Sequence, residues 1–317
     1  MARIITNDFS WSKSRHEKFS ECLRAYYLSY YRSWGGWADD APEDVRQLYV
    51  LKKLSNRYTW AGSVVHDAIK NVLLELRVGR SVDPNRVIDR AHHQMREDYK
   101  HSSRKAYWRE KNRRDFSGLV EHEYAEGVAP EEWKRNWEAA KAALTWFLGS
   151  RWMEVARTLP KDRWLEVDNK SFDETVFQLD GVRVFAIPDF AYVDDDGAPV
   201  VVDWKTGRMR EGYDEQVLGY ALYLSIRYGF PVEKVKAALV YLNDGLEQLV
   251  QVDLAAIESF KGHFRRSVGL MRELLVDPAG NVPRPEAAFP MTDNVATCGR
   301  CVFRRVCGRD GVAAKVA

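Results

Sequence analysis

Two aspartates and a lysine near the middle of the chain have the types and spacing of a metal site. Asp203 and Lys205 lie two residues apart at the end of the apolar run 200–202, and Asp189 follows Pro188. Residues i and i+2 of a strand project to the same face, so Asp203 and Lys205 are expected side by side. A buried strand that ends in two charges implies a ligand or an ion pair that offsets the cost of burying them.

The turn between these two segments favours placing the aspartates opposite each other. Residues 195–197 read Asp-Asp-Gly, which predicts a three-residue hairpin turn with its glycine in the left-handed conformation. Such a turn pairs Asp194 with Ala198, and the same register pairs Asp189 with Asp203. Two facing carboxylates beside a lysine suit a hard divalent cation, Mg²⁺ or Mn²⁺, that activates water for phosphodiester hydrolysis. On residue types alone, a strand-end ion pair explains the aspartate and the lysine equally well.

The elements that must position these side chains follow an α/β or α+β order. Helical patterns dominate the first half, and apolar runs with turn signals between them begin at Trp164. We predict a first helix that Ser12 or Ser14 caps and that runs to about Arg32, a second that follows Gly62 and runs to about Val78, and a third that opens at Asp83-Pro84. Further helices are predicted at 130–149, 213–228 and 254–275, and strands at 164–168, 174–179, 182–193, 199–205, 235–242 and 246–252. These elements divide the chain into a helical region (1–163), a core (164–252) and a C-terminal helix with a cysteine tail (253–317), which we expect to form one composite domain.

All four cysteines fit one metal centre. Cys298, Cys301 and Cys307 have the spacing C-x2-C-x5-C, and Cys22 lies on the first predicted helix. Four thiolates suit either tetrahedral Zn²⁺ or an iron–sulfur cluster. A zinc ribbon usually draws its ligands from two local C-x-x-C pairs, so a set divided between distant segments is unusual for it.

Bulk composition excludes little. The 48 Lys and Arg against 46 Asp and Glu give a net charge of +2, which neither supports nor excludes a nucleic-acid partner. The chain has no apolar run of roughly 18 residues and no secretion signal, so we expect a cytoplasmic protein without a membrane span. The absence of a G-x-x-x-x-G-K-[ST] phosphate loop indicates that the chain is not itself an ATP-driven motor.

Two groups of basic residues are candidate nucleic-acid contacts, each with a plainer explanation. The stretch 100–114 is rich in lysine and arginine and alternates with aromatic residues, which suits phosphates and bases or a solvated helix with a buried aromatic stripe. For the arginines around the last three cysteines, we expect either contacts with DNA or neutralisation of the negative charge of the thiolates. The residues concerned are Lys100, Arg104, Lys105, Arg109, Lys111, Arg113 and Arg114, with Tyr99, Tyr107, Trp108 and Phe116, and then Arg300, Arg304, Arg305 and Arg309.

The order of the motifs resembles the RecB-type branch of the PD-(D/E)XK nucleases. The resemblance rests on the Gly62–His66 segment, on Pro188-Asp189, on Asp203-Trp-Lys-Thr-Gly, and on Gln216 with Tyr220 one helical turn later. It implies a restriction-endonuclease-like core, with a mixed sheet flanked by helices.

The same resemblance implies roles for individual residues. The metal would be held by His66, Asp189, Asp203 and the backbone carbonyl of Trp204. Lys205 would serve the attacking water, and Gln216 and Tyr220 would complete the catalytic set. Glu166, on the first predicted strand, is expected to be a solvent-facing carboxylate, with an outer ligand as the alternative.

The cysteine pattern resembles the iron–sulfur members of the superfamily, the AddB-type subunits and the CRISPR-associated nucleases. It implies a 4Fe–4S cluster on Cys22, Cys298, Cys301 and Cys307 that fastens the first helix to the C-terminal tail, with Zn²⁺ as the alternative.

Together these features predict a Mg²⁺- or Mn²⁺-dependent DNA nuclease. The resemblance favours an exonuclease on single strands or DNA ends, acting in repair, recombination, CRISPR adaptation or defence, alone or with a helicase or another nuclease subunit. The alternative is a catalytically silent nucleic-acid-binding module with a structural zinc or iron–sulfur clasp.

Overall fold

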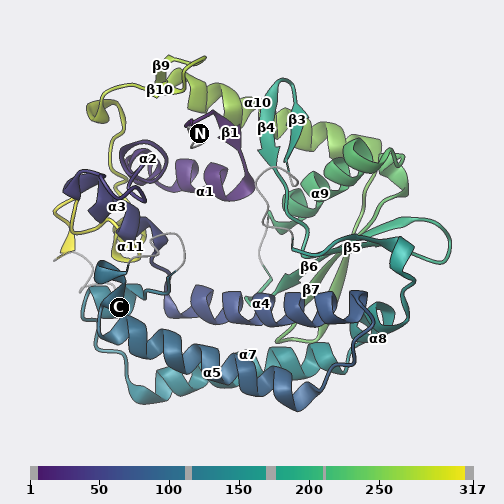
Figure 1. Ribbon diagram of the computed structural model, residues 1–317. Coiled ribbons are helices and arrows are strands. Elements are labelled where there is room, and N and C mark those ends of the chain that lie inside the picture. Colours follow the sequence, from purple (N-terminus) through teal and green to yellow (C-terminus); the bar gives the residue numbers. More distant parts are fainter. Residues whose placement is uncertain (1–5, 111–115, 169–175, 210–211, 311–317) are drawn as a thin grey trace.

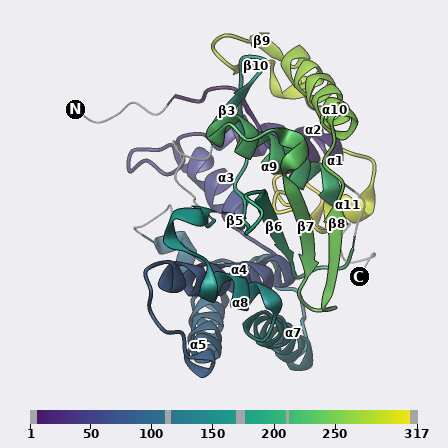
Figure 2. The ribbon, with the colours of Figure 1, turned by 90° about the vertical axis from the view of Figure 1, so that its right-hand side faces the viewer.

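A five-stranded mixed sheet lies at the centre of the chain. The computed structural model describes residues 6–110, 116–168, 176–209 and 212–310. The sheet has the order β2-β5-β6-β7-β8; β6 and β7 are parallel, and the other neighbours are antiparallel. Its strands are Trp164–Glu166 (β2), Phe190–Val193 (β5), Pro199–Lys205 (β6), Lys236–Tyr241 (β7) and Leu246–Val250 (β8). Helices on both sides of this sheet confirm the predicted mixed α/β class (Figures 1 and 2).

The hairpin register between β5 and β6 is the predicted one. Asp194 N donates to Ala198 O at 2.9 Å, and the ladder runs from Val193–Pro199 to Phe190–Val202. The next residue pair beyond this ladder is the two aspartates singled out from the sequence. A buried central strand with a well-defined turn therefore fixes the register locally.

The predicted strand at 182–193 is wrong, because the structure divides it. Val182–Phe185 (β4) pairs with Val176–Leu179 (β3) and with Ser10–Trp11 (β1) in a separate three-stranded sheet, whereas β5 belongs to the central sheet. Pro188 lies in the break, where its missing N–H excludes a regular ladder. The predicted strand at 174–179 begins in residues outside the described part.

One face of the sheet is covered by three helices of the first half. These helices are Arg57–Arg77 (α4), Pro130–Leu148 (α7) and Arg151–Thr158 (α8). They pack in one hydrophobic cluster with the buried side chains that β5, β6 and β7 direct to this face. Pro84–Ser103 (α5) lies outside them, against α4 and α7 (Figure 1). The opposite face is covered by Tyr213–Tyr228 (α9) and Leu254–Glu273 (α10). Burial on both faces explains why β6 contains a continuous run of valines.

The starts of the helices follow their capping residues. Asp83 caps α5 at Pro84, as the sequence predicts, and α9 has the predicted bounds. The predicted start of α4 after Gly62 is wrong, because Asn56 Oδ1 accepts hydrogen bonds from Tyr58 N and Thr59 N and the helix begins at Arg57. The helices α8 and Glu43–Lys53 (α3) were not predicted.

The first predicted helix is interrupted at Cys22. Lys13–Glu21 (α1) and Leu23–Tyr27 (α2) are separated by Cys22, whose φ of −163° and ψ of 114° are extended. The π-helical turn Leu28–Arg32 (η1) follows. The expectation of one helix to Arg32 is wrong because the amide after the break donates to the distant C-terminal segment, from Arg24 N to Pro290 O at 3.1 Å.

A third hydrophobic cluster joins the N-terminal helices to the C-terminal segment. It contains residues of α2, α3 and the segment around Phe303, with Cys22, Cys301 and Cys307 packed against it. In Figure 1 the C-terminal segment, drawn in yellow, passes close to α2 and α3. The remaining short elements are Ala106–Arg109 (η2), Val120–Glu123 (α6), Lys161–Arg163 (η3), Val232–Lys234 (η4), Leu275–Asp277 (β9), Val282–Pro283 (β10), Glu286–Ala288 (η5) and Val295–Gly299 (α11).

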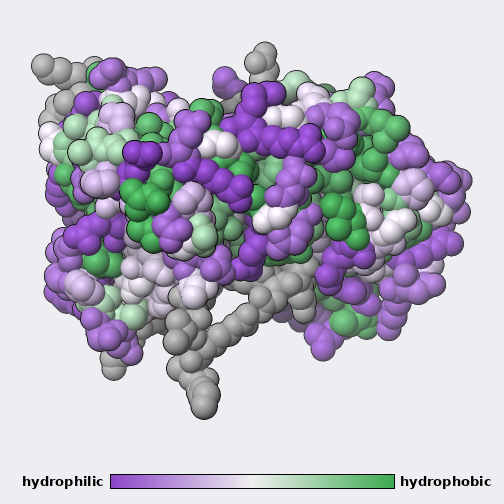
Figure 3. Space-filling view, turned by 90° about the horizontal axis from the view of Figure 1, so that it is seen from above, coloured by the Kyte–Doolittle hydropathy of each residue, from purple (hydrophilic) through white to green (hydrophobic). Residues whose placement is uncertain are grey.

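The surface is predominantly hydrophilic on the face seen in Figure 3, where hydrophobic side chains form small patches among polar ones. Within the described ranges, no helix has both the length and the apolar character needed to cross a bilayer.

Candidate active site

The end of β6 buries a carboxylate that is only partly compensated. Asp203 is 2% exposed, and its Oδ2 lies 2.6 Å from Lys205 Nζ. Asp203 Oδ2 therefore forms an ion pair with Lys205, and the Asp203 carboxylate also acts on the nearby Tyr220 hydroxyl. Burial and the negative charge of Asp189 raise the pKa of Asp203, against the opposing effect of Lys205. A buried oxygen with these surroundings is suited to bind a cation.

Asp189 is oriented by two elements. Its Oδ2 accepts a hydrogen bond of 2.7 Å from Trp204 N, so the peptide that follows Asp203 fixes the second carboxylate. Its Oδ1 lies 3.2 Å from His66 Nδ1. The two aspartates and the histidine, which are far apart in sequence, therefore meet at the end of β6.

His66 reaches this point because α4 passes very close to the residues after Lys205. A Cβ atom added to Gly62, one turn before His66, would lie 2.7 Å from Thr206 Oγ1. Burial alone would lower the pKa of His66, but the adjacent Asp189 carboxylate outweighs it and raises this pKa to about 9. The small residue and the histidine thus belong to one helical face that contacts the loop after β6.

Lys205 is held by a hydrogen-bonded chain from α9. Lys205 Nζ donates to Gln216 Oε1 at 2.7 Å, and Gln216 Nε2 donates to the Tyr220 hydroxyl at 2.5 Å. Burial and the nearby carboxylates of Asp203 and Asp189 raise the pKa of Tyr220 well above its ordinary value, so this hydroxyl stays protonated. The structure brings all six side chains of the expected site together.

Tyr213 is a neighbour of the site that the sequence reasoning missed. Lys205 Nζ lies 4.2 Å from the centre of its ring, a cation–π distance. Its position as the first residue of α9, directly after the loop that follows Lys205, is the signal that could have indicated it. The Trp204 side chain is buried against Phe147 and Trp152, so only its backbone faces the site.

Glu166 does not face solvent, and that expectation is wrong. It is 6% exposed, and its Oε1 accepts hydrogen bonds from the hydroxyls of Tyr223 at 2.6 Å and Tyr228 at 2.7 Å. Both tyrosines lie on the C-terminal half of α9, beyond the residues that contact Lys205. Glu166 therefore ties β2 to α9.

The four cysteines, none of which is in a disulfide, lie near one another. Burial and the neighbouring thiols of Cys301, Cys22 and Cys298 raise the pKa of Cys307 to about 11. Donors also point at the sulfurs, from Arg309 Nη1 to Cys298 Sγ at 3.2 Å and from Phe303 N to Cys301 Sγ at 3.4 Å. N–H···S contacts of this kind are typical around metal-bound thiolates, so the donor set fits a thiolate centre.

Neither group has metal-ligand spacing as it stands. Across the described residues, no set of three or more His, Cys, Asp and Glu side chains is arranged to hold a metal ion. In the candidate active site the polar groups contact one another instead, His66 with Asp189 and Lys205 with Asp203. The chemistry of both donor sets fits a metal, but their ligand roles stay predictions.

In the described part of the two basic groups, Lys100, Lys105, Arg304 and Arg305 are paired with acidic residues. Tyr107 is buried, and Tyr107, Trp108 and Arg305 all bond Glu123, which agrees with the packing explanation for the first group. Arg304 is buried against the Tyr124 ring and pairs with Glu126. Three further residues of the first basic group, Lys111, Arg113 and Arg114, lie outside the described residues.

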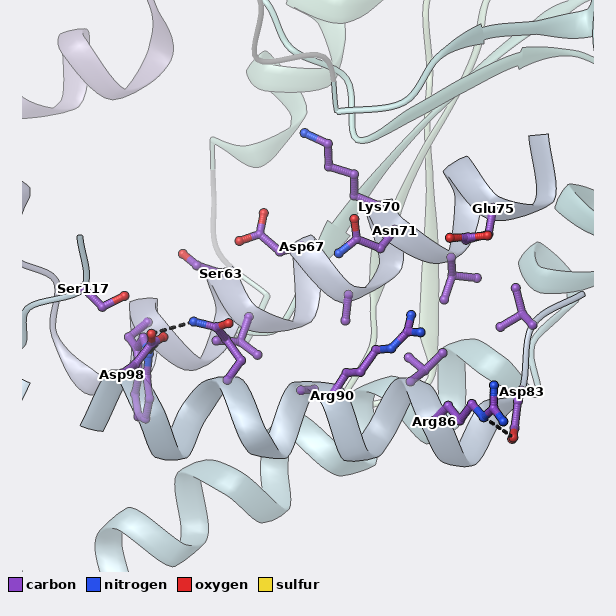
Figure 4. Close-up of a pocket in the computed structure, with 18 of the residues that line it drawn as sticks. Ser63, Asp67, Lys70, Asn71, Glu75, Asp83, Arg86, Arg90, Asp98 and Ser117 are labelled. Carbon is purple, nitrogen blue, oxygen red and sulfur yellow. Dashed lines mark hydrogen bonds and ion pairs between the residues drawn. The ribbon is translucent and has the colours of Figure 1, made fainter. Parts of the chain in front are cut away.

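A large cavity of about 1280 Å³ lies between α4 and α5 (Figure 4). In Figure 4, Arg90 extends from α5 toward α4, whereas Lys70 extends away from α5, and Lys70 lies 3.6 Å from Asp168. Acidic residues such as Asp67 and Asp98 line the same cavity. Its charges are therefore mixed.

Comparison with known proteins gives one match. A family model described as the PD-(D/E)XK nuclease superfamily matches residues 10–308, which include the six side chains of the candidate active site and all four cysteines. No curated protein matches the chain.

Proposed function

The chain belongs to the PD-(D/E)XK nuclease superfamily, and on that premise we propose that it is a Mg²⁺- or Mn²⁺-dependent deoxyribonuclease with its centre at Asp203. The superfamily consists of nucleases, which hydrolyse phosphodiester bonds and typically use one of these two ions. The observation that carries the assignment to Asp203 is its buried carboxylate, which forms an ion pair with Lys205 and lies close enough to Asp189 for the two negative charges to raise its pKa.

The proposed ligands are His66, Asp189, Asp203 and the backbone carbonyl of Trp204. Carboxylate and carbonyl oxygens suit Mg²⁺ and Mn²⁺, and the imidazole favours Mn²⁺ of the two. When bound, the ion would lower the pKa of a water molecule and offset the charge that develops on the phosphate. The contact of Trp204 N with Asp189 supports the assignment, because it orients one candidate ligand through the peptide of another.

Lys205 is proposed to orient the attacking water and to offset negative charge on the phosphate. Its ammonium group has three donors, of which one is committed to Gln216 Oε1. Gln216 is in turn held by the Tyr220 hydroxyl. Gln216 and Tyr220 therefore act as positioning residues that keep the lysine directed at the carboxylates.

For the four cysteines we propose a 4Fe–4S cluster, with Zn²⁺ as the alternative. The mutual effect of the thiols on their pKa values, the donors to Cys298 and Cys301, and the resemblance to the iron–sulfur branch support this proposal. Its proposed role is structural, since Cys22 belongs to the N-terminal helices and the other three to the C-terminal segment.

The finer biological assignment rests on the RecB-type motif order. It supports an exonuclease acting on single strands or DNA ends in repair, recombination, CRISPR adaptation or defence, with a helicase or nuclease subunit as a partner. The competing function is a binding module that does not cleave.

A digestion of linear and single-stranded DNA, with and without EDTA, tests the proposal. The protein should cleave only with Mg²⁺ or Mn²⁺. Lys205→Ala should reduce cleavage by about 100- to 10 000-fold, the contribution expected of a group that positions a proton transfer. Lys236→Ala is the matched control, because this lysine lies on the neighbouring strand and pairs with Asp194 outside the site. DNA binding without cleavage by the wild-type protein would favour the binding module.

A further inference from the structure

A second cavity, of about 670 Å³, opens on the other side of α4 from the one in Figure 4. It lies between the beginning of α4, the middle of α7 and the loop that follows β6. Its volume is in the range of pockets that take nucleotide-sized ligands. The residues that line it include Tyr58, Gly62, Asn136, Thr206, Arg208 and Tyr213.

This cavity is directly beside the candidate active site. Gly62 lies one turn before His66 on α4, and Thr206 is the residue after Lys205. Tyr213 contributes to the lining while its ring contacts Lys205 Nζ. A group that enters the cavity is therefore adjacent to a phosphate held at Asp203 and Lys205.

Asn136 gives the cavity an unsatisfied polar group. This residue of α7 is 6% exposed, and across the described residues its Oδ1 has no hydrogen-bond partner. A buried amide oxygen without a partner destabilises the fold unless a ligand supplies one. A side-chain amide offers one acceptor and two donors, which is the pattern that complements the edge of a nucleobase.

The rim carries the complementary features of a strand-binding surface. Tyr58 is 63% exposed, and Arg57 lies over its ring with Cζ 4.6 Å from the centre. An exposed aromatic ring stacks on any unpaired base, and the exposed Arg208 adds positive charge for the backbone. In contrast, the larger cavity in Figure 4 combines mixed charges, and within it Arg86 is paired with Asp83.

We propose that this second cavity takes one unpaired nucleobase of the substrate strand, from the nucleotide next to the scissile phosphodiester. Asn136 hydrogen-bonds the edge of the base, and Tyr58 stacks on it or on its neighbour at the rim. The proposal rests on the proposed nuclease function and specifies its substrate, a strand that is single or locally unpaired at this nucleotide. A base held here fixes the position of the adjacent phosphate.

Binding in EDTA tests this inference separately from cleavage. Fluorescence anisotropy would compare an intact single strand with strands that carry one abasic site at successive positions. For the wild-type protein we expect about tenfold weaker binding at one position only, the size of one lost stacking contact. Asn136→Leu and Tyr58→Ala should weaken binding of the intact strand and remove the sensitivity to that abasic site.

The controls separate binding from folding. Asn136→Leu removes an unsatisfied polar group, so its Tm should equal or exceed that of the wild type. Tyr58→Phe keeps the ring and should retain binding, and Leu249→Ala removes an exposed side chain on β8, away from the cavity.

The outcomes are distinct. Abasic penalties that are unchanged in Asn136→Leu and Tyr58→Ala would overturn the inference, and so would an equal loss of binding to a closed duplex. If the wild-type protein cleaves DNA with Mn²⁺ but shows no position-specific penalty, the inference fails and the proposed function stands. If it cleaves no DNA with either ion, the proposed function itself fails.

Discussion

Lys205 and Gln216 share a hydrogen bond of 2.7 Å that couples the end of β6 to the first turns of α9. The lysine is thereby held within 2.6 Å of the Asp203 carboxylate. A flexible lysine would otherwise lose side-chain entropy on being ordered at each turnover. This hydrogen bond links the Asp203–Lys205 motif at the end of β6 to the Gln216–Tyr220 motif on α9, which explains why the two motifs occur together in the chain.

The first prediction concerns Gln216. Gln216→Ala should lower kcat by about 10- to 100-fold, as for other residues that orient a reacting group, with little change in KM. The reason is that Lys205 keeps its charge but loses its orientation. Steady-state kinetics on a labelled strand would measure this, and Gln248→Ala, on β8, is the control. A rise in KM at constant kcat would instead place Gln216 in substrate binding.

His66 gives a prediction on metal affinity. His66→Ala should weaken Mn²⁺ binding at least about tenfold, and cleavage should recover at high Mn²⁺ concentration, because two carboxylates remain. Calorimetric titration with Mn²⁺ measures the affinity directly. His93→Ala is the control, since this histidine is exposed on α5. Equal affinity in the wild type and in His66→Ala would exclude the histidine from the ligand set.

The close approach of α4 to the loop after β6 can be tested at Gly62. Gly62→Ala should reduce both stability, by about 1–3 kcal/mol, and cleavage, because the new Cβ would lie 2.7 Å from Thr206 Oγ1. Gly127→Ala, where no atom lies within 4 Å, should be neutral. Thr206→Ala combined with Gly62→Ala should recover most of the loss, and additive effects in this double-mutant cycle would contradict the contact.

The Glu166 network should affect stability and leave cleavage unchanged. Tyr223→Phe removes one of two hydroxyls that satisfy a buried carboxylate, so we expect a loss of about 1–3 kcal/mol in the free energy of unfolding. Tyr228→Phe should cost less, because Tyr228 is partly exposed. Denaturant unfolding gives both values. A loss of activity per folded molecule in Tyr223→Phe would revive the outer-ligand role for Glu166.

The four cysteines offer a test of the metal content of the protein. Each of the four single Cys→Ser variants should lose iron and sulfide, measured after anaerobic purification; zinc in a colourless wild-type protein would select the alternative metal. Any variant that keeps full metal content identifies a cysteine that is not a ligand.

His16 should make the fold sensitive to acid. Burial, with nearby His263 and Lys13, lowers the pKa of His16 to about 4, whereas the unfolded residue titrates near 6.5. The unfolded chain therefore binds the proton more readily, so the free energy of unfolding should fall as pH decreases from 6.5 toward 4. Denaturant unfolding across this window should show a shallower decrease for His16→Gln. An unchanged slope would contradict the shifted pKa, and His93→Gln is the control.

Local signals in the sequence were sufficient for the centre of the fold. The hairpin register depends on one turn and one buried strand, both contained within twenty residues, so Asp189 and Asp203 could be placed from the sequence. The cap at Asp83 is equally local. Two of the errors, at Glu166 and at Cys22, occurred where the partner is remote in sequence, because no local pattern indicates such a partner. Glu166 is buried by hydroxyls from residues 57 and 62 positions away, and the break at Cys22 is accompanied by a bond from Arg24 to Pro290.

The contacts between the N-terminal helices and residues 286–290 affect how the chain folds during its synthesis. Arg24 donates from Nε to Phe289 O at 2.8 Å and pairs with Glu286 at 2.6 Å, so the N-terminal helices reach their final contacts only after residues 286–290 have left the ribosome. Until these residues have been synthesised, α2 lacks its contacts with them, although the strands of the central sheet have already been translated. We therefore expect these contacts of the N-terminal helices to form late in folding, and truncation before this segment should leave Arg24 without these partners.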